Sequence, residues 1–122
     1  MEKVLIIEDE VIIALRFSTY FKQSGYEITD SVTTGEEAIL SAKKNTPDLI
    51  IADIGLAGEI NGIQAIEEIY KQKEIPIIFV TAYQNEEYKE MTKQFKTIGF
   101  FVKPIDLETI AIKLQEYLLK NK

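Results

Sequence analysis

The feature that most constrains the fold of this sequence is a short aliphatic run that ends in a carboxylate. Residues 49–52 are continuously apolar, Pro47 precedes them, and Asp53 follows. A run of this length, bounded by a proline and a glycine-containing segment, is typical of a strand buried on both faces, as in a parallel sheet. Asp53 then lies at the carboxyl end of its strand, where open α/β sheets place their ligands and chemistry. A carboxylate at this position is a cap, a ligand or a nucleophile.

Short apolar runs alternate with amphipathic segments along the chain, which predicts five strand–helix units in succession. The predicted strands cover residues 3–7, 26–33, 49–53, 75–81 and 100–102, and the predicted helices cover 11–24, 34–45, 63–75, 85–95 and about 106 onward. The fourth helix carries an apolar stripe of Tyr88, Met91 and Phe95, and the last carries one of Leu107, Ile110, Ala111, Leu114 and Leu118, with Asp106 as its N-cap. This order implies an α/β fold with a doubly wound, five-stranded parallel sheet and right-handed crossovers.

Composition narrows the chemistry that this fold can carry. At 122 residues the chain has the size of one domain, 1–122, and we expect a cytoplasmic protein because no apolar run approaches the length of a membrane span. Cysteine and histidine are absent, which excludes disulfides, thiolate or histidine catalysis, and the usual zinc sites. A formal net charge of −6 argues against direct nucleic-acid binding. A magnesium site or a protein partner suits this balance better.

The carboxyl ends of four predicted strands bring polar residues to one edge of the sheet. Glu8 and Asp9 follow the first strand, Asp53 ends the third, Thr81 ends the fourth and Lys103 follows the fifth. Three carboxylates this close are costly unless a cation neutralises them, and Mg²⁺ prefers a few carboxylates together with water and phosphate oxygens. With Mg²⁺ and Lys103 neutralising an incoming phosphoryl group, Asp53 can attack its phosphorus in line.

Four stretches of the sequence resemble the receiver domain of two-component response regulators. They are Val4-Leu5-Ile6-Ile7-Glu8-Asp9-Glu10, the strand from Pro47 to Asp53, Thr81-Ala82, and Phe101-Val102-Lys103-Pro104. The motifs occur in order and at suitable spacing over essentially the whole chain. The resemblance implies a flavodoxin-like (βα)5 fold with strand order 2-1-3-4-5. It also implies a phosphoacceptor signalling domain rather than an enzyme, one that catalyses only its own phosphorylation and dephosphorylation.

The resemblance implies a phosphoacceptor and a metal site. Asp53 is similar to the aspartate that receives phosphate from a histidine on a partner kinase. Asp9 is similar to a direct Mg²⁺ ligand, and Glu8 to a second acid that acts directly or through water. The backbone carbonyl of Gly55 occupies the position of a further Mg²⁺ ligand.

The remaining site residues match the phosphate contact and the switch. Lys103 resembles the lysine that contacts the phosphate, and its bond to Pro104 is similar to one that is usually cis in this family. Thr81 and Phe100 match the pair in which a hydroxyl moves to the phosphate and an aromatic ring turns inward behind it. Tyr83, two residues after Thr81, is expected to shield the aspartyl phosphate from water.

The implied partners are a histidine kinase or phosphotransfer protein and a second copy of the chain. The homodimer would form through the face made by the fourth helix, the fifth strand and the fifth helix, which is also where phosphorylation would be read. Neither nucleic acid nor a membrane is expected as a direct partner. Ile112, Tyr117 and Leu119 lie off the core stripe of the last helix, either as scattered surface residues or as part of a contact surface with the helix of Tyr88.

Simpler explanations exist for each residue alone. Glu8 or Asp9 could cap the first helix, Thr81 could be an ordinary strand residue, and Lys103 could be a solvated charge. Their convergence on strand ends favours a site. Two other functions stay open: a receiver-like module that binds partners without phosphorylation, and an aspartyl-nucleophile phosphohydrolase. Such a phosphohydrolase generally has a second acid two residues after the nucleophile, where this chain has Gly55.

Overall fold

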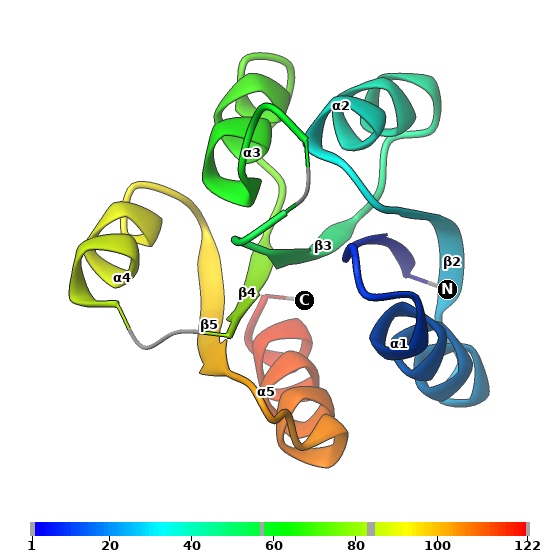
Figure 1. Ribbon diagram of the computed structural model, residues 1–122. Coiled ribbons are helices and arrows are strands. Elements are labelled where there is room, and N and C mark those ends of the chain that lie inside the picture. Colours follow the sequence, from blue (N-terminus) through cyan, green and yellow to red (C-terminus); the bar gives the residue numbers. More distant parts are fainter. Residues whose placement is uncertain (1, 57, 83–84, 122) are drawn as a thin grey trace.

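The computed structural model describes residues 2–56, 58–82 and 85–121, which form five strands alternating with five helices (Figure 1). The strands are β1 (Lys3–Ile7), β2 (Glu27–Val32), β3 (Leu49–Asp53), β4 (Ile77–Thr81) and β5 (Thr97–Val102). The helices are α1 (Val11–Gln23), α2 (Gly35–Lys44), α3 (Gly62–Tyr70), α4 (Glu86–Thr92) and α5 (Leu107–Lys120).

The strands form one sheet in the order β2-β1-β3-β4-β5, and every neighbouring pair is parallel. The predicted fold class, a doubly wound five-stranded parallel sheet in the order 2-1-3-4-5, is therefore confirmed. Because parallel strands share one direction, the residues that follow β1, β3, β4 and β5 meet at the same edge of the sheet.

Helices cover both faces of this sheet, so its central strands are apolar on both sides (Figure 1). Successive side chains of a strand point to opposite faces. On one face α1 and α5 pack on Val4, Ile6, Leu49, Ile51, Ile78 and Val80. On the other face α2 and α3 pack on Leu5, Ile7, Ile50, Ala52, Ile77 and Phe79, with Tyr88 of α4 packed against the same cluster.

The predicted elements differ from the structure mainly around α3, α4 and β5. The third helix ends at Tyr70 rather than just before Pro76. The fifth strand begins at Thr97 rather than residue 100. The sequence pattern hides this start because Gly99, which has no side chain, interrupts the apolar pattern around the buried Ile98. The fourth helix ends at Thr92 rather than residue 95. The backbone turns after Thr92, whose carbonyl accepts a hydrogen bond from the Thr97 hydroxyl. The placement of Met91 on the buried stripe was wrong, since Met91 is 43% exposed and its neighbour Thr92 is buried.

The last helix follows its predicted pattern more closely. Asp106 caps it, with its side chain accepting a hydrogen bond from the Glu108 backbone. Ile110 and Leu114 are fully buried, whereas the other members of the predicted stripe, Leu107, Ala111 and Leu118, are half-buried at its margins. Off the stripe, Ile112 and Leu119 are exposed and Tyr117 packs against the cluster under α1 and α5.

Candidate functional site

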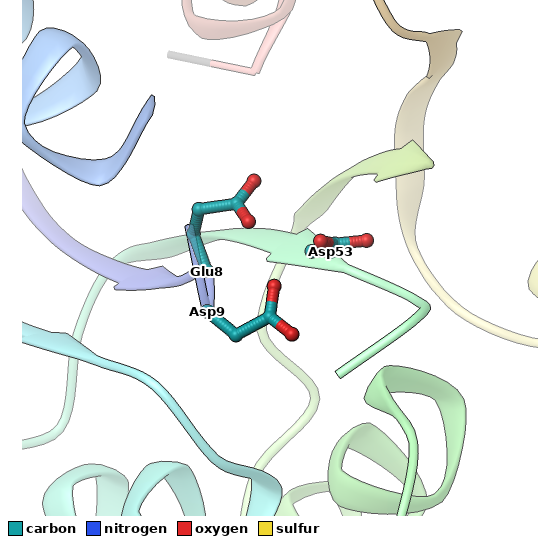
Figure 2. Close-up of side chains that lie close together, drawn as sticks. All are labelled: Glu8, Asp9 and Asp53. Carbon is teal, nitrogen blue, oxygen red and sulfur yellow. The ribbon is translucent and has the colours of Figure 1, made fainter. Parts of the chain in front are cut away.

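The site lies where β1, β3, β4 and β5 end. Glu8 is 1% exposed, Asp53 3% and Thr81 1%, and these are among the few polar side chains that the described chain buries. Figure 2 shows Glu8 and Asp9 at the end of β1 beside Asp53 at the end of β3. Burial of this kind is expensive for charged groups unless they are paired or coordinate a cation.

Glu8, Asp9 and Asp53 form a cluster of three carboxylates. One oxygen from each lies within 4.8 Å of the others, close enough for all three to share a single ion. Glu8 Oε1 is buried and lies 2.9 Å from the Lys103 ammonium nitrogen, which leaves it one further acceptor lone pair. Hard carboxylate oxygens with spare acceptor capacity are the ligands that Mg²⁺ prefers, so this donor set fits that ion.

Lys103 supplies the opposite charge. Its Nζ lies 2.9 Å from Glu8 Oε1 and 3.0 Å from Asp53 Oδ2, and its side chain is only 11% exposed. The Lys103 backbone N–H donates to the Thr81 carbonyl at 2.7 Å, and the following peptide bond to Pro104 is cis. Lys103 is therefore not a solvated surface charge. It follows β5, and its ammonium contacts Glu8 after β1 and Asp53 at the end of β3.

These contacts, together with burial, raise the pKa values of both Glu8 and Lys103. Burial, with a smaller contribution from Asp53, raises the pKa of Glu8 to about 7, against the opposing hydrogen bonds from Lys103 and the Glu10 backbone. Burial lowers the pKa of Lys103, but its contacts with Glu8 and Asp53 outweigh that effect and raise the pKa above its usual range. The lysine therefore stays charged, and a cation binding to Glu8 competes with a proton.

The loop after Asp53 is closed tightly over the end of β3. The Gly55 backbone N–H donates to Asp53 Oδ1 at 3.0 Å, and the Gly62 N–H donates to the Ile54 carbonyl at 2.9 Å. A Cβ on Gly62 would lie 2.2 Å from the Asp53 backbone oxygen, so only glycine allows α3 to begin this close to the strand. The loop holds one Asp53 oxygen in place while the other faces Lys103.

The two residues expected to act as a switch lie on neighbouring strands. Thr81 ends β4, paired with Val102, and Phe100 of β5 is paired with Phe79. Phe100 is half-buried and packs against the cluster under α2 and α3. Tyr83 lies outside the described residues.

Glu10 was not singled out by the sequence, although it belongs to the same acidic run as Glu8 and Asp9. It occupies the N-cap position of α1, so neither Glu8 nor Asp9 holds the cap position suggested by the simpler explanation. Its carboxylate lies 3.5 Å from Lys103 Nζ. Sequence alone cannot rank three adjacent acids, because only the direction of each side chain separates them.

The chain has a flavodoxin-like α/β fold with a buried acidic cluster and a lysine at the carboxyl edge of its sheet. This combination is the one expected of a receiver domain. The response regulator receiver domain matches residues 4–115. The chain therefore belongs to the response regulator receiver domain family, which comprises signalling domains of two-component systems.

Two relatives and one solved structure illustrate the likeness. Transcriptional regulatory protein PdtaR of Mycobacterium tuberculosis is 32% identical over 92% of this chain, and the chain spans 55% of the length of that relative. Sporulation initiation phosphotransferase F of Bacillus subtilis is 29% identical over 96% of this chain and 94% of the relative. The structure of Vibrio cholerae chemotaxis protein CheY4 is similar with a TM-score of 0.84 and 30% identity, covering 95% of this chain and 98% of that one.

The described helices run from seven to fourteen residues, and each carries charged side chains. None of them is long and apolar enough to cross a membrane.

Proposed function

We propose that residues 1–122 form one receiver domain that accepts a phosphoryl group on Asp53 from the phosphohistidine of a partner kinase or phosphotransfer protein. The observation that carries this proposal is the pair of contacts at the strand ends, in which Lys103 Nζ lies 2.9 Å from Glu8 and 3.0 Å from Asp53 beside the clustered carboxylate of Asp9. A nucleophilic carboxylate, a cation site and a phosphate-binding ammonium are the parts that phosphoryl transfer needs.

Mg²⁺ is the proposed cofactor, held by Glu8, Asp9 and Asp53 with the Gly55 backbone carbonyl. When bound, it supplies positive charge that offsets the charge on the phosphoryl oxygens. The three clustered carboxylates, of which Glu8 and Asp53 are buried, support this choice.

Three residues of the site have separate roles in the transfer. The Gly55 N–H holds one Asp53 oxygen by a hydrogen bond. The other Asp53 oxygen can then attack the phosphorus as the bond between the phosphorus and the donor nitrogen breaks. Lys103 is already charged and close to that oxygen, so it can neutralise the phosphoryl group as it arrives. Thr81, at the end of the adjacent strand β4, can donate a hydrogen bond from its hydroxyl to a phosphoryl oxygen.

The surface beside the site is suited to a protein donor. Val11 is 71% exposed, Ile12 76% and Leu15 64%, all on the first two turns of α1 directly after the acidic run. Large aliphatic side chains exposed together are typical of interaction surfaces. A partner that covers them places its phosphohistidine next to Asp53.

The output of the domain is a change on the face formed by α4, β5 and α5. Movement of Thr81 to the phosphate vacates space toward which the ring of Phe100 can turn, and a bias of a few kcal/mol is enough to shift such a two-state element. This face can contact an attached output domain, a separate partner or a second copy of the chain. In this account the domain catalyses only its own phosphorylation and dephosphorylation.

Phosphorylation from a small donor tests the proposal directly. Incubation of the protein with acetyl phosphate and Mg²⁺ is expected to add one phosphoryl group by intact mass, and none is expected in EDTA or in the Asp53→Asn variant. Labelling that persists in Asp53→Asn would remove Asp53 from this role. Continued hydrolysis of a phosphate ester, such as p-nitrophenyl phosphate, would favour the phosphohydrolase instead.

A further inference from the structure

Lys103 has a third carboxylate partner on its solvent side. Glu8 and Asp53 contact the ammonium from the interior, with side chains only 1% and 5% exposed. The Glu10 carboxylate contacts it at 3.5 Å with a side chain that is 58% exposed. The positive charge at the site is therefore enclosed by negative charge, and Glu10 is the exposed part of that enclosure.

The local structure directs Glu10 toward the lysine. Its backbone N–H donates to Glu8 Oε2 at 3.0 Å, which ties the start of α1 to the buried acid. Glu10 occupies the N-cap position, yet its side chain makes no capping hydrogen bond. The backbone is held by the site, and the carboxylate is left to interact with Lys103.

A phosphoryl donor that approaches Lys103 from solvent meets the exposed Glu10 carboxylate. Asp53 and Glu8 are buried, so the donor arrives from solvent, on the side where Glu10 lies. The donor's oxygens compete with Glu10 for the Lys103 ammonium and are repelled by its charge. Both effects grow with the negative charge of the donor.

We propose that Glu10 is a specificity-determining residue that slows phosphorylation by small, highly charged donors by holding Lys103 from the solvent side. This inference rests on the proposed function. With acetyl phosphate, an Asp53 oxygen bonds to phosphorus as the bond from phosphorus to the acetyl oxygen breaks, and acetate leaves with the electron pair. Glu10 takes no part in these bond changes and acts only through the lysine and its own charge.

Rates of phosphorylation by two donors of different charge test the role of Glu10. In Glu10→Gln, the rate constant with acetyl phosphate, doubly negative at neutral pH, is expected to rise roughly fivefold at low ionic strength and saturating Mg²⁺. The rise is expected to be smaller with phosphoramidate, which carries one negative charge. About 1 M salt should remove most of the gain, because it shortens the screening length to about 3 Å.

Glu67→Gln is the matched control. It removes the same charge from an exposed position on α3 and is expected to leave both rates unchanged. Rates in Glu10→Gln that are unchanged, or raised equally for both donors, would overturn the role of Glu10 while Asp53 labelling stands. Absence of labelling in the unmodified protein would instead overturn the proposed function itself.

Discussion

The central strands of the sheet and its β5 edge differ in how deeply they are buried. Every residue of β3 and β4 is buried, and so is all of β1 after Lys3. At this edge, β5 has only one buried residue, Ile98, and the seven-residue α4 beside it buries only Thr92. We refer to β1, β3 and β4 as the central strands and to β5 with α4 as the edge unit.

This difference separates the two tasks that the proposed function requires. The central strands present Glu8, Asp53 and Thr81 from buried backbone, so the geometry of the site is hard to disturb. The edge unit carries the half-buried Phe100 and loses few buried contacts when it moves. Regions with few buried contacts open at lower free-energy cost, so the edge is where a switch can operate.

The largest effect is expected from two matched glycine substitutions, one on α3 against the central strand β3 and one within the edge unit. In Gly62→Ala the new methyl meets the Asp53 backbone oxygen at 2.2 Å, and backbone cannot yield, so we expect a loss of about 3–5 kcal/mol in the free energy of unfolding. In Gly99→Ala the methyl meets the half-buried Phe101 ring, which can turn aside, so we expect a loss below about 1.5 kcal/mol. Urea unfolding measures both, and equal losses would abolish the distinction between the regions.

A pH-dependent loss of stability is expected from Glu8. Its pKa is raised to about 7 from the ordinary glutamate value of 4.5, so the folded protein holds a proton that the unfolded chain releases. Without divalent ions, the free energy of unfolding should therefore fall as pH rises from about 4.5 to about 7, by on the order of 2 kcal/mol. Lys103 stays charged throughout this range and adds no slope.

Urea unfolding in EDTA at several pH values measures this slope. Saturating Mg²⁺ should offset the loss at neutral pH, because the cation replaces the proton. Glu8→Gln should flatten the profile, whereas Glu67→Gln should leave it intact. A profile in Glu8→Gln as steep as in the unmodified protein would show that another group titrates.

A smaller effect is expected from the exposed surface of α1. Ile12→Ala should slow phosphotransfer from the partner kinase by about tenfold, because an aliphatic contact is lost, while labelling by acetyl phosphate stays unchanged. Leu40→Ala is the control, since Leu40 is similarly exposed, at 68%, on α2 across the sheet. Equal slowing by the two variants would place the donor's contact elsewhere.

The smallest effect is expected within α4. Met91→Ala should change the free energy of unfolding by less than about 0.5 kcal/mol, because its side chain is 43% exposed. Thr92→Ala should cost about 1 kcal/mol, because Thr92 is buried and its hydroxyl donates to the Lys89 carbonyl at 2.7 Å. A larger cost for Met91 than for Thr92 would restore the apolar stripe expected from the sequence.

The same contrast explains what could be predicted from the sequence. Strands buried on both faces read as continuous aliphatic runs, so the central strands and the acids that follow them were located closely. The edge unit mixes exposed and buried positions, and Gly99 breaks its pattern, so the bounds of β5 and α4 were misjudged. The roles of the site residues rest on the family resemblance.

Two features of the site depend on which residues come close together in the folded chain, and the sequence indicates neither of them. The contact of Glu10 with Lys103 joins residues from opposite ends of the chain, and nothing in the acidic run distinguishes the acid that turns outward. The need for glycine at position 62 arises from the passage of α3 against the Asp53 backbone. Neither propensity nor periodicity reports such approaches.

Hydrogen exchange of the protein before and after phosphorylation by acetyl phosphate and Mg²⁺ tests the central claim, that a change at Asp53 is read in the edge unit. We expect exchange in α4 and β5 to change by about tenfold or more, and amides of β1 and β3 to change much less. Asp53→Asn under the same conditions should show no change. Full phosphorylation of Asp53 with unaltered exchange in α4 and β5 would contradict this account.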